Sequence, residues 1–414
     1  MSMKKVLVVG HVWPEPKTTA AGNRMLQLLE AFLSQSYQIT FACVAAKTAH
    51  SHNLKELGIT EQSISLNDSS FDKWVKELRP HMVIFDRFMV EEQFGWRIAL
   101  ACPMAIRILN TEDLHSLREY RKLCAKESKS FQTMKWLQRD KTKRECASIF
   151  RSDITLVISA VEMKILTEDL KIDRNLLWHL PFLLERIDTS TSAIFPTFKE
   201  RSGFMIVGNG KHAPNVDAMT YLRQKIWPII RKQLPKANLH VYGAYLPQRV
   251  YDLKNNALGF FVHGQVNDID FEIRRRRLVL APLRFGAGIK GKLIKAMQNG
   301  TPSVTTSIGA EGMHGNISWP GRVANDSLEF AQSAIELYQS EEEWYDAQQC
   351  GIKIINSLYE KQQLVTAFFD RLGALEKSLD EHRSENFIGA ILQHQSMAAT
   401  TYMGKWIEEK NKST

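Results

Sequence analysis

A glycine-rich segment in the second half of the chain is a near-match to a phosphate-binding loop. The stretch Ala281–Val304 reads APLRFGAGIKGKLIKAMQNGTPSV, in which Gly286 and the pair Gly291-Lys292 have the spacing G-x-x-x-x-G-K. In loops that bind ATP or GTP, the next residue is Ser or Thr, and its hydroxyl holds Mg²⁺. Here the next residue is Leu293, so the segment lacks the magnesium ligand of that class.

The same segment nevertheless has the features of an anion site. An apolar run, a glycine-rich loop and a helical pattern beginning near Lys290 follow one another. Gly286 and Gly288 allow the backbone to approach a ligand closely, because they carry no Cβ. The helix points its free N–H groups and its positive dipole end at the loop. Lys290, Lys292 and Arg284 add cations, so we predict a phosphate site here.

Length and composition limit the kinds of protein in which this loop can work. A chain of 414 residues is longer than one hydrophobic core usually supports, so we expect two domains. Hydrophobic residues make up 44% of the chain, and no apolar run reaches the roughly 18 residues of a membrane span. The opening MSMKKVLVVGHVWPEP is basic and then apolar, but Trp13–Pro16 stands where a signal peptide has small residues. We expect a cytoplasmic protein.

Apolar runs alternate with amphipathic runs, which indicates parallel strands covered by helices on both faces. The expected strands are Lys5–Val9, Gln38–Ala45, Met82–Asp86, Ala105–Leu109 and Ile154–Ser159, then Phe204–Gly208, Asn238–Gly243, Phe260–Gly264, Leu278–Pro282 and Pro302–Thr306. The expected helices are Asn23–Ser34, Phe71–Leu78, Glu91–Ala101, Leu117–Phe150 and Val161–Leu170, then Asn215–Gln233, Pro247–Asn256, Asp268–Arg275 and Lys290–Gln298, with helical structure from about Glu341 onward.

These elements predict an α/β protein with two doubly wound domains. We expect the first domain over residues 1–185, a linker over 186–203, the second domain over 204–375 and a helical tail over 376–414, with packing back on the first domain as one option. Such sheets bind ligands beyond the carboxyl ends of their strands, so the cleft between the domains is the natural site. A dinucleotide site is not favoured, since VVGHVWPEPKTTAAG lacks G-x-G-x-x-G.

The net charge of +9 favours polyanionic partners. Between Arg118 and Arg151 there are eleven Lys or Arg residues against four Asp or Glu residues. A long helix with a solvated basic face explains this excess. The alternative is contact with an anionic acceptor or an anionic membrane, which would place the protein peripherally at the inner membrane face. No nucleic-acid-binding motif accompanies the charge, so we expect no nucleic-acid partner.

The segments around the glycine-rich loop resemble a known family. Downstream lies NGTPSVTTSIGAEGM (Asn299–Met313), and upstream lies GNGKHAPNVDAMTYLRQKIWPIIRKQLPKANLHVYG (Gly208–Gly243). Together with PLRFGAGIKGK and the opening WPEP…AAGNRMLQLLEAF, they resemble the glycosyltransferases of the GT-B fold, group 1 or family 4. The resemblance implies two Rossmann-like domains facing across a cleft. It also implies transfer of a sugar from a nucleoside-diphosphate sugar to a hydroxyl acceptor, which is a glycan, a lipid-linked glycan or a protein glycan.

The resemblance also implies roles for individual residues of the second domain. The donor would contact Gly208, Asn209, Gly210, Tyr242, Gly243, Gly264, Arg284, Gly286, Gly288, Lys290, Lys292, Gly309, Ala310, Glu311, Gly312 and Met313. Lys290 and Lys292 would offset the charge of the leaving diphosphate, which makes Lys290 a catalytic candidate. We therefore expect a retaining hexosyltransferase-type enzyme that needs no metal ion and no cofactor beyond the donor co-substrate.

One departure from the family pattern concerns two carboxylates. The wider family carries two glutamates around the helix start, and the corresponding positions here are Ala287 and Lys295. Glu311 is a candidate substitute for one of them. A catalytically impaired protein that binds a nucleotide-sugar or a glycan is therefore the alternative function.

In the first domain, LNTEDLHSLRE brings Glu112, Asp113 and His115 together after the fourth expected strand. A carboxylate or an imidazole there could take the proton of the acceptor hydroxyl or orient that hydroxyl. Family members often place a His or an Asp in this loop, so Asp113 and His115 are the catalytic candidates. Capping of the following helix by Thr111 or Asp113 is an equally consistent interpretation.

Other residues of the first domain are expected at the cleft. Asp86 and Arg87 end the third expected strand, although an ion pair that only holds the loop explains them too. Gly22, Asn23 and Arg24 begin the first expected helix, whose free N–H groups could meet the donor phosphate.

Two further acidic patterns have structural interpretations. Ser159 and Glu162 in SAVE have the spacing of a capping box. The pair Asp268-x-Asp270 occurs as a metal site in another glycosyltransferase fold, but it precedes FEIRRRR and suits a helix start. We predict no metal site.

Overall fold

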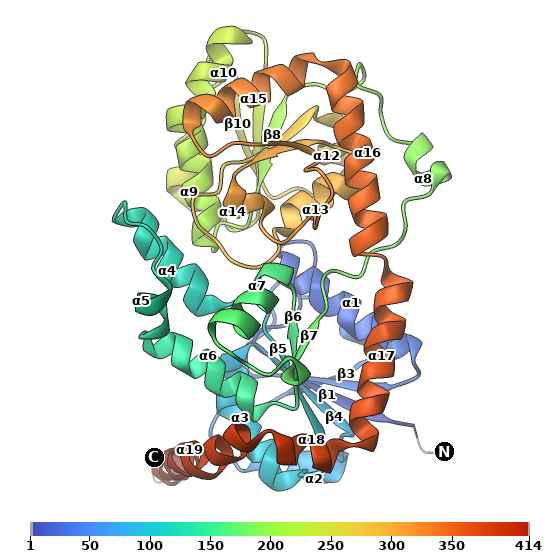
Figure 1. Cartoon of the computed structure of the whole chain (residues 1–414), viewed down its shortest axis with the longest axis vertical. Coiled ribbons are helices and arrows are strands. Elements are labelled where there is room, and N and C mark those ends of the chain that lie inside the picture. The colour runs from blue at the N-terminus through green and yellow to red at the C-terminus, as the bar shows by residue number, and fades with distance from the viewer. Residues whose placement is uncertain (1–2, 413–414) are drawn as a thin grey trace.

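Two parallel sheets, each covered by helices, form two domains that stack along the long axis of the molecule (Figure 1). The computed structural model describes residues 3–412, apart from the side chains of residues 395–398 and 412. The central strands are short and almost fully buried, which agrees with their near-continuous apolar sequences. The expected fold class is confirmed.

The first sheet has seven parallel strands in the order β3-β2-β1-β4-β5-β6-β7. Its strands are β1 (Lys5–Gly10), β2 (Gln38–Cys43), β3 (Thr60–Ser63), β4 (Met82–Asp86), β5 (Ile106–Asn110), β6 (Ile154–Val157) and β7 (Leu177–His179). The helices of this domain are α1 (Ala20–Ser34), α2 (Ser70–Leu78), α3 (Phe88–Ala101), α4 (His115–Lys126), α5 (Thr133–Leu137), α6 (Asp140–Arg151) and α7 (Ala160–Lys164), with short turns at Leu54–Leu57, Ile165–Asp169 and Arg174–Leu176.

The second sheet has six parallel strands in the order β10-β9-β8-β11-β12-β13. Its strands are β8 (Phe204–Val207), β9 (Leu239–Tyr242), β10 (Phe260–Gly264), β11 (Leu278–Ala281), β12 (Ser303–Thr305) and β13 (Gly321–Val323). The helices are α9 (Ala213–Tyr221), which continues through a wide turn at Leu222–Ile226 into α10 (Trp227–Gln233), then α11 (Gln248–Tyr251), α12 (Ile269–Arg275), α13 (Gly291–Gln298), α14 (Ser307–Ala310), α15 (Ser327–Gln339) and α16 (Glu341–Leu358).

The chain crosses between the domains twice. The first crossing is the expected linker, which carries the small helix α8 (Thr189–Ala193) on the flank of the molecule (Figure 1). The second crossing follows α16, where the amide of Leu184 donates to the carbonyl of Tyr359 over 2.8 Å. The chain therefore returns to the first domain near residue 360, before the boundary expected at 375.

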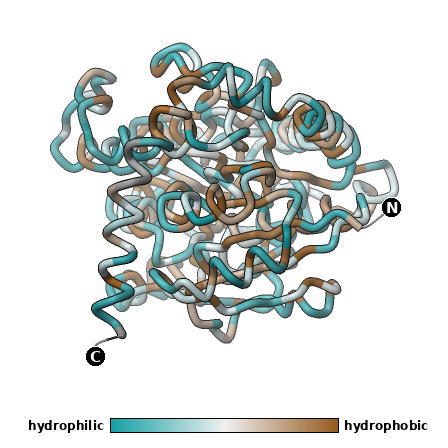
Figure 2. The backbone as a smooth tube through the Cα atoms, turned by 90° about the horizontal axis from the view of Figure 1, so that it is seen from below, coloured by the Kyte–Doolittle hydropathy of each residue, from teal (hydrophilic) through white to brown (hydrophobic). Residues whose placement is uncertain are grey.

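The returning segment consists of α17 (Lys361–Lys377), α18 (Leu379–Glu385) and α19 (Phe387–Lys412). Val365, Phe368 and Leu372 of α17 are buried in the core of the first domain. Helix α19 lies against α3 and α6, and Arg97 forms a 2.5 Å ion pair with Glu408. Figure 2 shows α19 at the edge of the first domain, away from the apolar strands of the centre. None of the described helices is long and apolar enough to cross a membrane.

One expected helix was wrong, and three strands were not expected. The basic segment Leu117–Phe150 is not one helix, because the chain turns between Lys126 and Thr133, where Ser128 has a φ of 53°. Strands β3, β7 and β13 were missed. They lie at sheet edges, pair on one side only and are too short to show a period.

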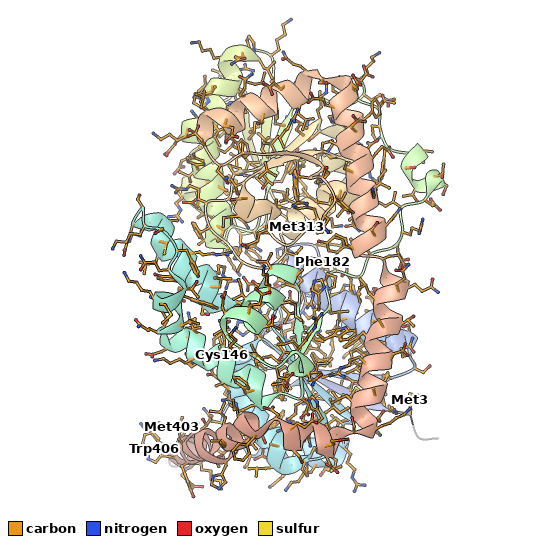
Figure 3. The ribbon with its side chains drawn as sticks, viewed as in Figure 1. Met3, Cys146, Phe182, Met313, Met403 and Trp406 are labelled. Atoms are coloured by element: carbon orange, nitrogen blue, oxygen red, sulfur yellow. The ribbon has the colours of Figure 1, made fainter. Side chains whose placement is uncertain are left out.

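A hydrophobic cluster joins the two domains. It contains Phe182 and Leu184 from the end of the first domain and Ile289, Leu293 and Met313 from the second. Figure 3 shows Phe182 and Met313 close to the domain junction. This shared core holds the loops of the two domains against each other.

Candidate active site between the two domains

The two sheets place their reversals of strand order at the domain junction. The order reverses between β1 and β4 in the first sheet and between β8 and β11 in the second, and ligands of open parallel sheets bind at such points. Loops that follow these strands meet across the junction. Asn209 Nδ2 donates to the carbonyl of Thr18 over 3.2 Å, and the hydroxyl of Tyr245 donates to the carboxylate of Glu15 over 3.1 Å.

The glycine-rich loop after β11 lies in this junction. Gly288 has a φ of +64°, and a Cβ atom there would lie 2.8 Å from the Cβ atom of Asp113 in the first domain. A side chain at position 288 would therefore push the domains apart. Lys290 is only 7% exposed, and its Nζ donates to the carbonyl of Gly288 over 2.7 Å. The lysine and the start of α13 thus face the first domain.

Glu162 connects the two domains through backbone amides. Its Oε1 accepts the N–H of Gly288 over 2.7 Å and the N–H of Leu114 over 3.3 Å. Its Oε2 is buried without a hydrogen-bond partner. The capping box expected for Ser159 and Glu162 is wrong, because Ser159 makes no side-chain cap and Glu162 turns toward the junction instead. Burial and the charge of Asp113 raise the pKa of Glu162.

Arg121 of α4 forms the second polar connection. Its guanidinium binds Glu311 with both terminal nitrogens, over 2.6 and 2.8 Å, and also donates to the carbonyl of Gly286 over 3.0 Å. This forked geometry fixes the orientation of both partners. Glu311, which was expected to contact the donor, is held by the first domain in this arrangement.

The two lysines of the loop are desolvated. Burial lowers the pKa of Lys290 to about 8, although the carboxylates of Glu311 and Glu162 oppose this shift. Burial, aided by the charge of Lys290, lowers the pKa of Lys292 to about 7. Lys292 Nζ donates to Oδ1 of Asn215 over 2.6 Å, so its partner is a neutral amide. An anion entering the loop would meet Lys292, which has no carboxylate partner, and would favour the protonated form of both lysines.

On the first-domain side, Glu112 and Arg24 support each other. Glu112 has a φ of 62°, and its Oε1 lies 3.1 Å from Arg24 Nη1 and 2.9 Å from Asn110 Nδ2. Arg24 Nη2 donates to the carbonyl of Leu180 over 2.7 Å, and Arg24 is 2% exposed. Burial raises the pKa of Glu112. Both side chains are thus buried and already hydrogen-bonded to each other and to neighbouring groups of the first domain.

Asp113 and His115 lie side by side beneath the glycine-rich loop. Asp113 pairs with Arg118, and its Oδ1 is 3.4 Å from His115 Nε2. Burial alone would raise the pKa of Asp113, but Arg118 and His115 bring it below its ordinary value. Burial lowers the pKa of His115 to about 3, so the imidazole is neutral at pH 7. The pair offers a charged carboxylate and a neutral imidazole to a hydroxyl group.

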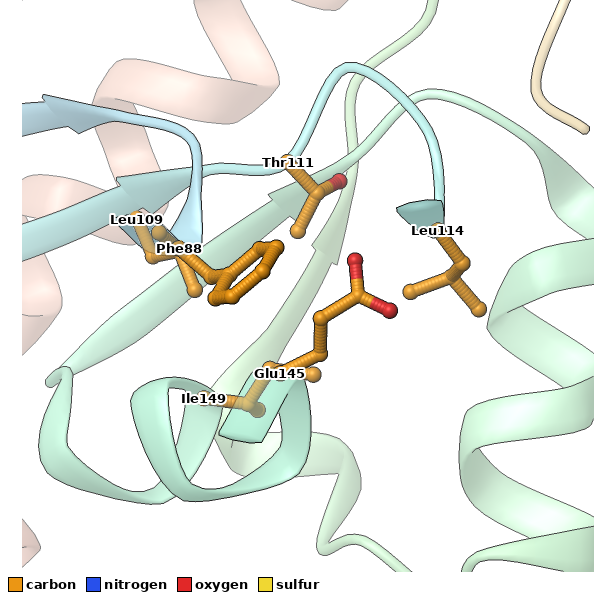
Figure 4. Close-up of a pocket in the computed structure, with 6 residues that line it drawn as sticks. All are labelled: Phe88, Leu109, Thr111, Leu114, Glu145 and Ile149. Carbon is orange, nitrogen blue, oxygen red and sulfur yellow. The ribbon is translucent and has the colours of Figure 1, made fainter. Parts of the chain in front are cut away.

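A buried glutamate holds this loop in place. Glu145 of α6 accepts the N–H groups of His115 and Ser116 over 2.7 and 2.8 Å, and so caps the start of α4. Figure 4 shows Glu145 beside a small cavity of about 10 Å³, lined by Phe88, Leu109, Thr111, Leu114, Glu145 and Ile149. Burial raises the pKa of Glu145 to about 7. The side chain of Thr111 donates to the carbonyl of Leu156 and does not cap α4.

The other first-domain candidates lie at the carboxyl ends of β1 and β4. The amide of His11 donates to Asp86 Oδ2 over 3.2 Å, and Asp86 Oδ1 lies 3.7 Å from Arg87 Nε. At the start of α1, the amide of Gly22 donates to the hydroxyl of its cap Thr19 over 2.9 Å. Asn23 Oδ1 accepts a hydrogen bond from Gln27 of the same helix.

Several second-domain candidates form the backbone frame of the junction. Gly208 donates to the carbonyl of Tyr242 over 3.0 Å, and Gly243 donates to the carbonyl of Gly264 over 2.8 Å. A Cβ atom at Gly210 would collide with the carbonyl of Tyr245, which makes glycine necessary there. The hydroxyl of Tyr242 is bound by Glu272 and Arg276, so this side chain is anchored within the domain.

Some of the expected donor-binding residues do not lie beside Lys290 at the glycine-rich loop. Arg284 pairs with Asp217, and its side chain is 46% exposed, outside the loop. Met313 is fully buried, and its carbonyl accepts the hydroxyl of Tyr359 over 2.8 Å. Gly309 donates to the cap Thr306. Ala310 is also buried. Gly312 has a φ of +73°, and a Cβ atom there would collide with the hydroxyl of Ser159 in the first domain.

The positions that depart from the family pattern have their own contacts. Ala287 packs against the core of the first domain. Lys295 pairs with Asp270 over 2.9 Å, and Asp270 also accepts from Asn299 over 2.6 Å. Asp268 caps α12 by accepting the N–H of Phe271 over 2.9 Å. Among residues 3–412, apart from the undescribed side chains, no group of three or more His, Cys, Asp or Glu could hold a metal ion.

Sequence reasoning missed Arg121 and His212 and misjudged Glu162. Arg121 is one of many cations in a basic segment, so its type carried no signal. His212 follows the Gly208–Gly210 turn, and burial lowers its pKa to about 4, with further lowering by Arg118 of the first domain. Its place directly after a glycine turn at a strand end was a signal that could have identified it.

Comparisons with known proteins agree with this geometry. Residues 201–340 match the family model described as glycosyl transferases group 1. An uncharacterised 44.6 kDa protein in the cps region of Klebsiella pneumoniae is 23% identical over 172 residues, which are 40% of this chain and 44% of that protein. The chain thus matches less than half of the length of that relative.

Solved structures resemble the chain over most of its length. A glycosyltransferase from Rickettsia africae has a TM-score of 0.65 at 10% identity, covering 89% of this chain and 98% of its own. A TarM mutant from S. aureus, in complex with Fondaparinux, alpha-GlcNAc-glycerol and UDP, has a TM-score of 0.67 at 8% identity, covering 89% and 99%. Anabaena HepE in complex with UDP-glucose has a TM-score of 0.64 at 11% identity, covering 90% and 100%. The expected resemblance is confirmed: residues 201–340 match the family model of the glycosyl transferases group 1, within a chain that has the GT-B fold.

Proposed function

We propose that this protein transfers a sugar from a nucleoside-diphosphate sugar to a hydroxyl acceptor. The observation that supports this function best is the position of Lys290. It lies buried at the start of α13, within a glycine-rich loop that is pressed against Asp113 and Glu162 of the other domain. A diphosphate in the loop would place the sugar beside the Asp113 and His115 pair.

The chemistry follows from the charges around the loop. The bond between the anomeric carbon and the diphosphate oxygen breaks, and a bond from the acceptor oxygen to the same carbon forms. Lys290 and Lys292 stabilise the charge that develops on the leaving diphosphate. Asp113, which is ionised, holds the acceptor hydroxyl and receives its proton, or passes it to the departing phosphate. We propose that the anomeric configuration is retained, and that neither a metal ion nor a further cofactor is required.

The relatives suggest the donor class. HepE was crystallised with UDP-glucose and TarM with UDP, and both share the fold of this chain. A UDP-hexose is therefore the first donor to test, followed by GDP-, ADP- and CDP-sugars. Activity that persists in excess EDTA would support metal independence, and NMR of the product would establish its anomeric configuration.

The decisive experiment is Lys290→Ala. Loss of one preorganised charge at a developing anion typically lowers turnover roughly 10²- to 10³-fold. We expect that loss in donor hydrolysis and in transfer, with the far-UV spectrum unchanged. Lys225→Ala, at an exposed lysine of the same domain, is the matched control. Turnover in Lys290→Ala equal to that of Lys225→Ala would contradict the proposed function of this lysine.

A second candidate function is favoured by the contacts of Lys295 and Ala287. Lys295 is occupied by Asp270, and Ala287 offers no carboxylate to a ligand. If these positions no longer support turnover, the protein binds a nucleotide-sugar or a glycan without transferring it. Saturable binding of a UDP-sugar with no hydrolysis or transfer would favour this candidate.

We also propose a peripheral contact with anionic membranes on the basic side of the first domain. Phe131, in the turn between α4 and α5, is 38% exposed, and Met134, in α5, is 69% exposed, next to the basic residues of the same segment. Apolar side chains beside lysines are a combination that binds anionic lipid surfaces. Equal sedimentation with phosphatidylserine vesicles and with phosphatidylcholine vesicles would contradict this contact.

A further inference from the structure

Basic side chains from both domains gather beyond the carboxyl ends of β1 and β4, a region that we call the crevice. His11 follows β1, Arg87 follows β4, and His115 and Arg118 lie in the first turn of α4. His212 reaches the same place from the second domain, where the charges of Arg118 and Arg87 contribute to lowering its pKa. We call these five residues the crevice cluster. They occupy the reversal of strand order, where such sheets bind ligands.

Arg87 has an incomplete set of partners. Within the described part of the chain, its only ion pair is with Asp86, at 3.7 Å from Nε, and Nε is buried without a hydrogen bond. Its two terminal nitrogens take part in none of the hydrogen bonds formed among the described side chains. The side chain is 20% exposed, so the forked edge of the guanidinium is open to the crevice.

The backbone of Arg87 has an unusual conformation. Arg87 has φ and ψ angles of 78° and 157°, which are unfavourable for a residue with a side chain. Its amide donates to the carbonyl of Asn110 over 2.8 Å, which secures the conformation. Backbone strain that is maintained in this way concentrates at sites of function.

The remaining charges of the crevice are already balanced or neutral. Asp113 is matched by Arg118, and Glu112 is matched by Arg24. Burial lowers the pKa values of His11, His115 and His212, so these imidazoles are neutral and free to gain a proton beside an anion. Lys292 faces a neutral amide. Asp86 reaches Arg87 only at Nε, so the two terminal nitrogens of Arg87 remain available to an oxyanion.

We propose that the crevice cluster binds an oxyanion carried by the acceptor, a phosphate or a carboxylate, through the fork of Arg87. The inference rests on the proposed function, since the first domain supplies the acceptor site only in a glycosyltransferase. It adds that the acceptor is anionic. Asp113 lies against Gly288 of the glycine-rich loop, whereas Arg87 pairs with Asp86 at the end of β4, so the anion of the acceptor and the diphosphate of the donor would occupy separate sites.

The test uses glycerol 3-phosphate and glucuronate as probes of the two oxyanions, with binding measured by calorimetry at constant ionic strength. We expect saturable binding of at least one probe to the wild-type chain, a tenfold or greater loss in Arg87→Gln and a smaller loss in Arg87→Lys, which keeps the charge but not the fork. Arg174→Gln, at an exposed arginine of the same domain, should bind as the wild type does. The stronger probe identifies the oxyanion.

Further variants separate this inference from the proposed function. Lys290→Ala should bind the probe normally while losing turnover. Loss of probe binding in Lys290→Ala, with normal binding in Arg87→Gln, would show that the anion occupies the donor loop and would overturn the inference. Probe binding through Arg87 without turnover on any nucleotide-sugar would instead overturn the proposed function alone. Wild-type affinity in a folded Arg87→Gln would refute the crevice site.

Discussion

Lys292 illustrates how burial of a single residue produces a measurable pH dependence. Its pKa of about 7 means that the side chain is charged below pH 7 and neutral above it, until a diphosphate binds and restores the proton. Affinity for UDP should therefore fall as the pH rises from 7 to 9, at most about tenfold per pH unit. Lys292→Arg, which stays charged, should bind with a flatter profile, and calorimetry at pH 6–9 measures both. A profile of the arginine variant as steep as that of the wild type would contradict the assignment.

At this scale, the sequence reveals residues whose roles depend on local spacing. The glycines and lysines around position 290 could be identified because strand, loop and helix follow one another directly. Arg121 and Glu162 could not, because their partners in the second domain lie 190 and 126 positions away. Neither side chain belongs to a motif. Each of the two side chains has a role only because one domain closes on the other.

At the scale of elements, Glu145 links α6 to the start of α4. Its pKa is about 7 in the folded protein and about 4.3 in an unfolded chain, so the folded form binds more protons between these values. The contribution of Glu145 to the free energy of unfolding is thus complete below pH 4.3 and is lost as the pH rises to 7. A glutamine at this position does not ionise, so the free energy of unfolding of Glu145→Gln should not decrease in this way as the pH rises. Its melting temperature should rise relative to wild type between pH 5 and 8, whereas exposed Glu168→Gln should show no such trend.

Central strands could be predicted closely and edge strands could not, for a physical reason. β1 and β4 are buried on both faces and pair on both sides, so their sequences are continuously apolar. β3 reads TEQS and pairs only with β2, so its residues are free to be polar. The division of the basic segment into α4, α5 and α6 could not be predicted either, because the turns between these helices contain no Gly or Pro.

At the scale of the whole molecule, polar contacts and an apolar cluster hold the domains together without a ligand. Glu162 binds Gly288, and Arg121 binds Glu311, while Phe182 and Met313 lie in the shared core. These polar contacts involve the loop that we propose to bind the donor. Donor entry must therefore compete with them, which couples domain opening to donor binding.

The ion pair of Arg121 and Glu311 provides the clearest test of this coupling. Arg121→Glu places two carboxylates face to face, so we expect the ligand-free domains to open and the radius of gyration in X-ray scattering to increase. The charge swap Arg121→Glu with Glu311→Arg should restore closure, with a coupling of roughly 0.5–3 kcal/mol in the free energy of unfolding. Arg144→Glu is the matched control, because its forked partner Glu92 belongs to the same domain. If all three proteins scatter alike, then the pair does not hold the domains closed, and the remaining contacts, Glu162 with Gly288 and the apolar cluster, keep the donor loop against the first domain.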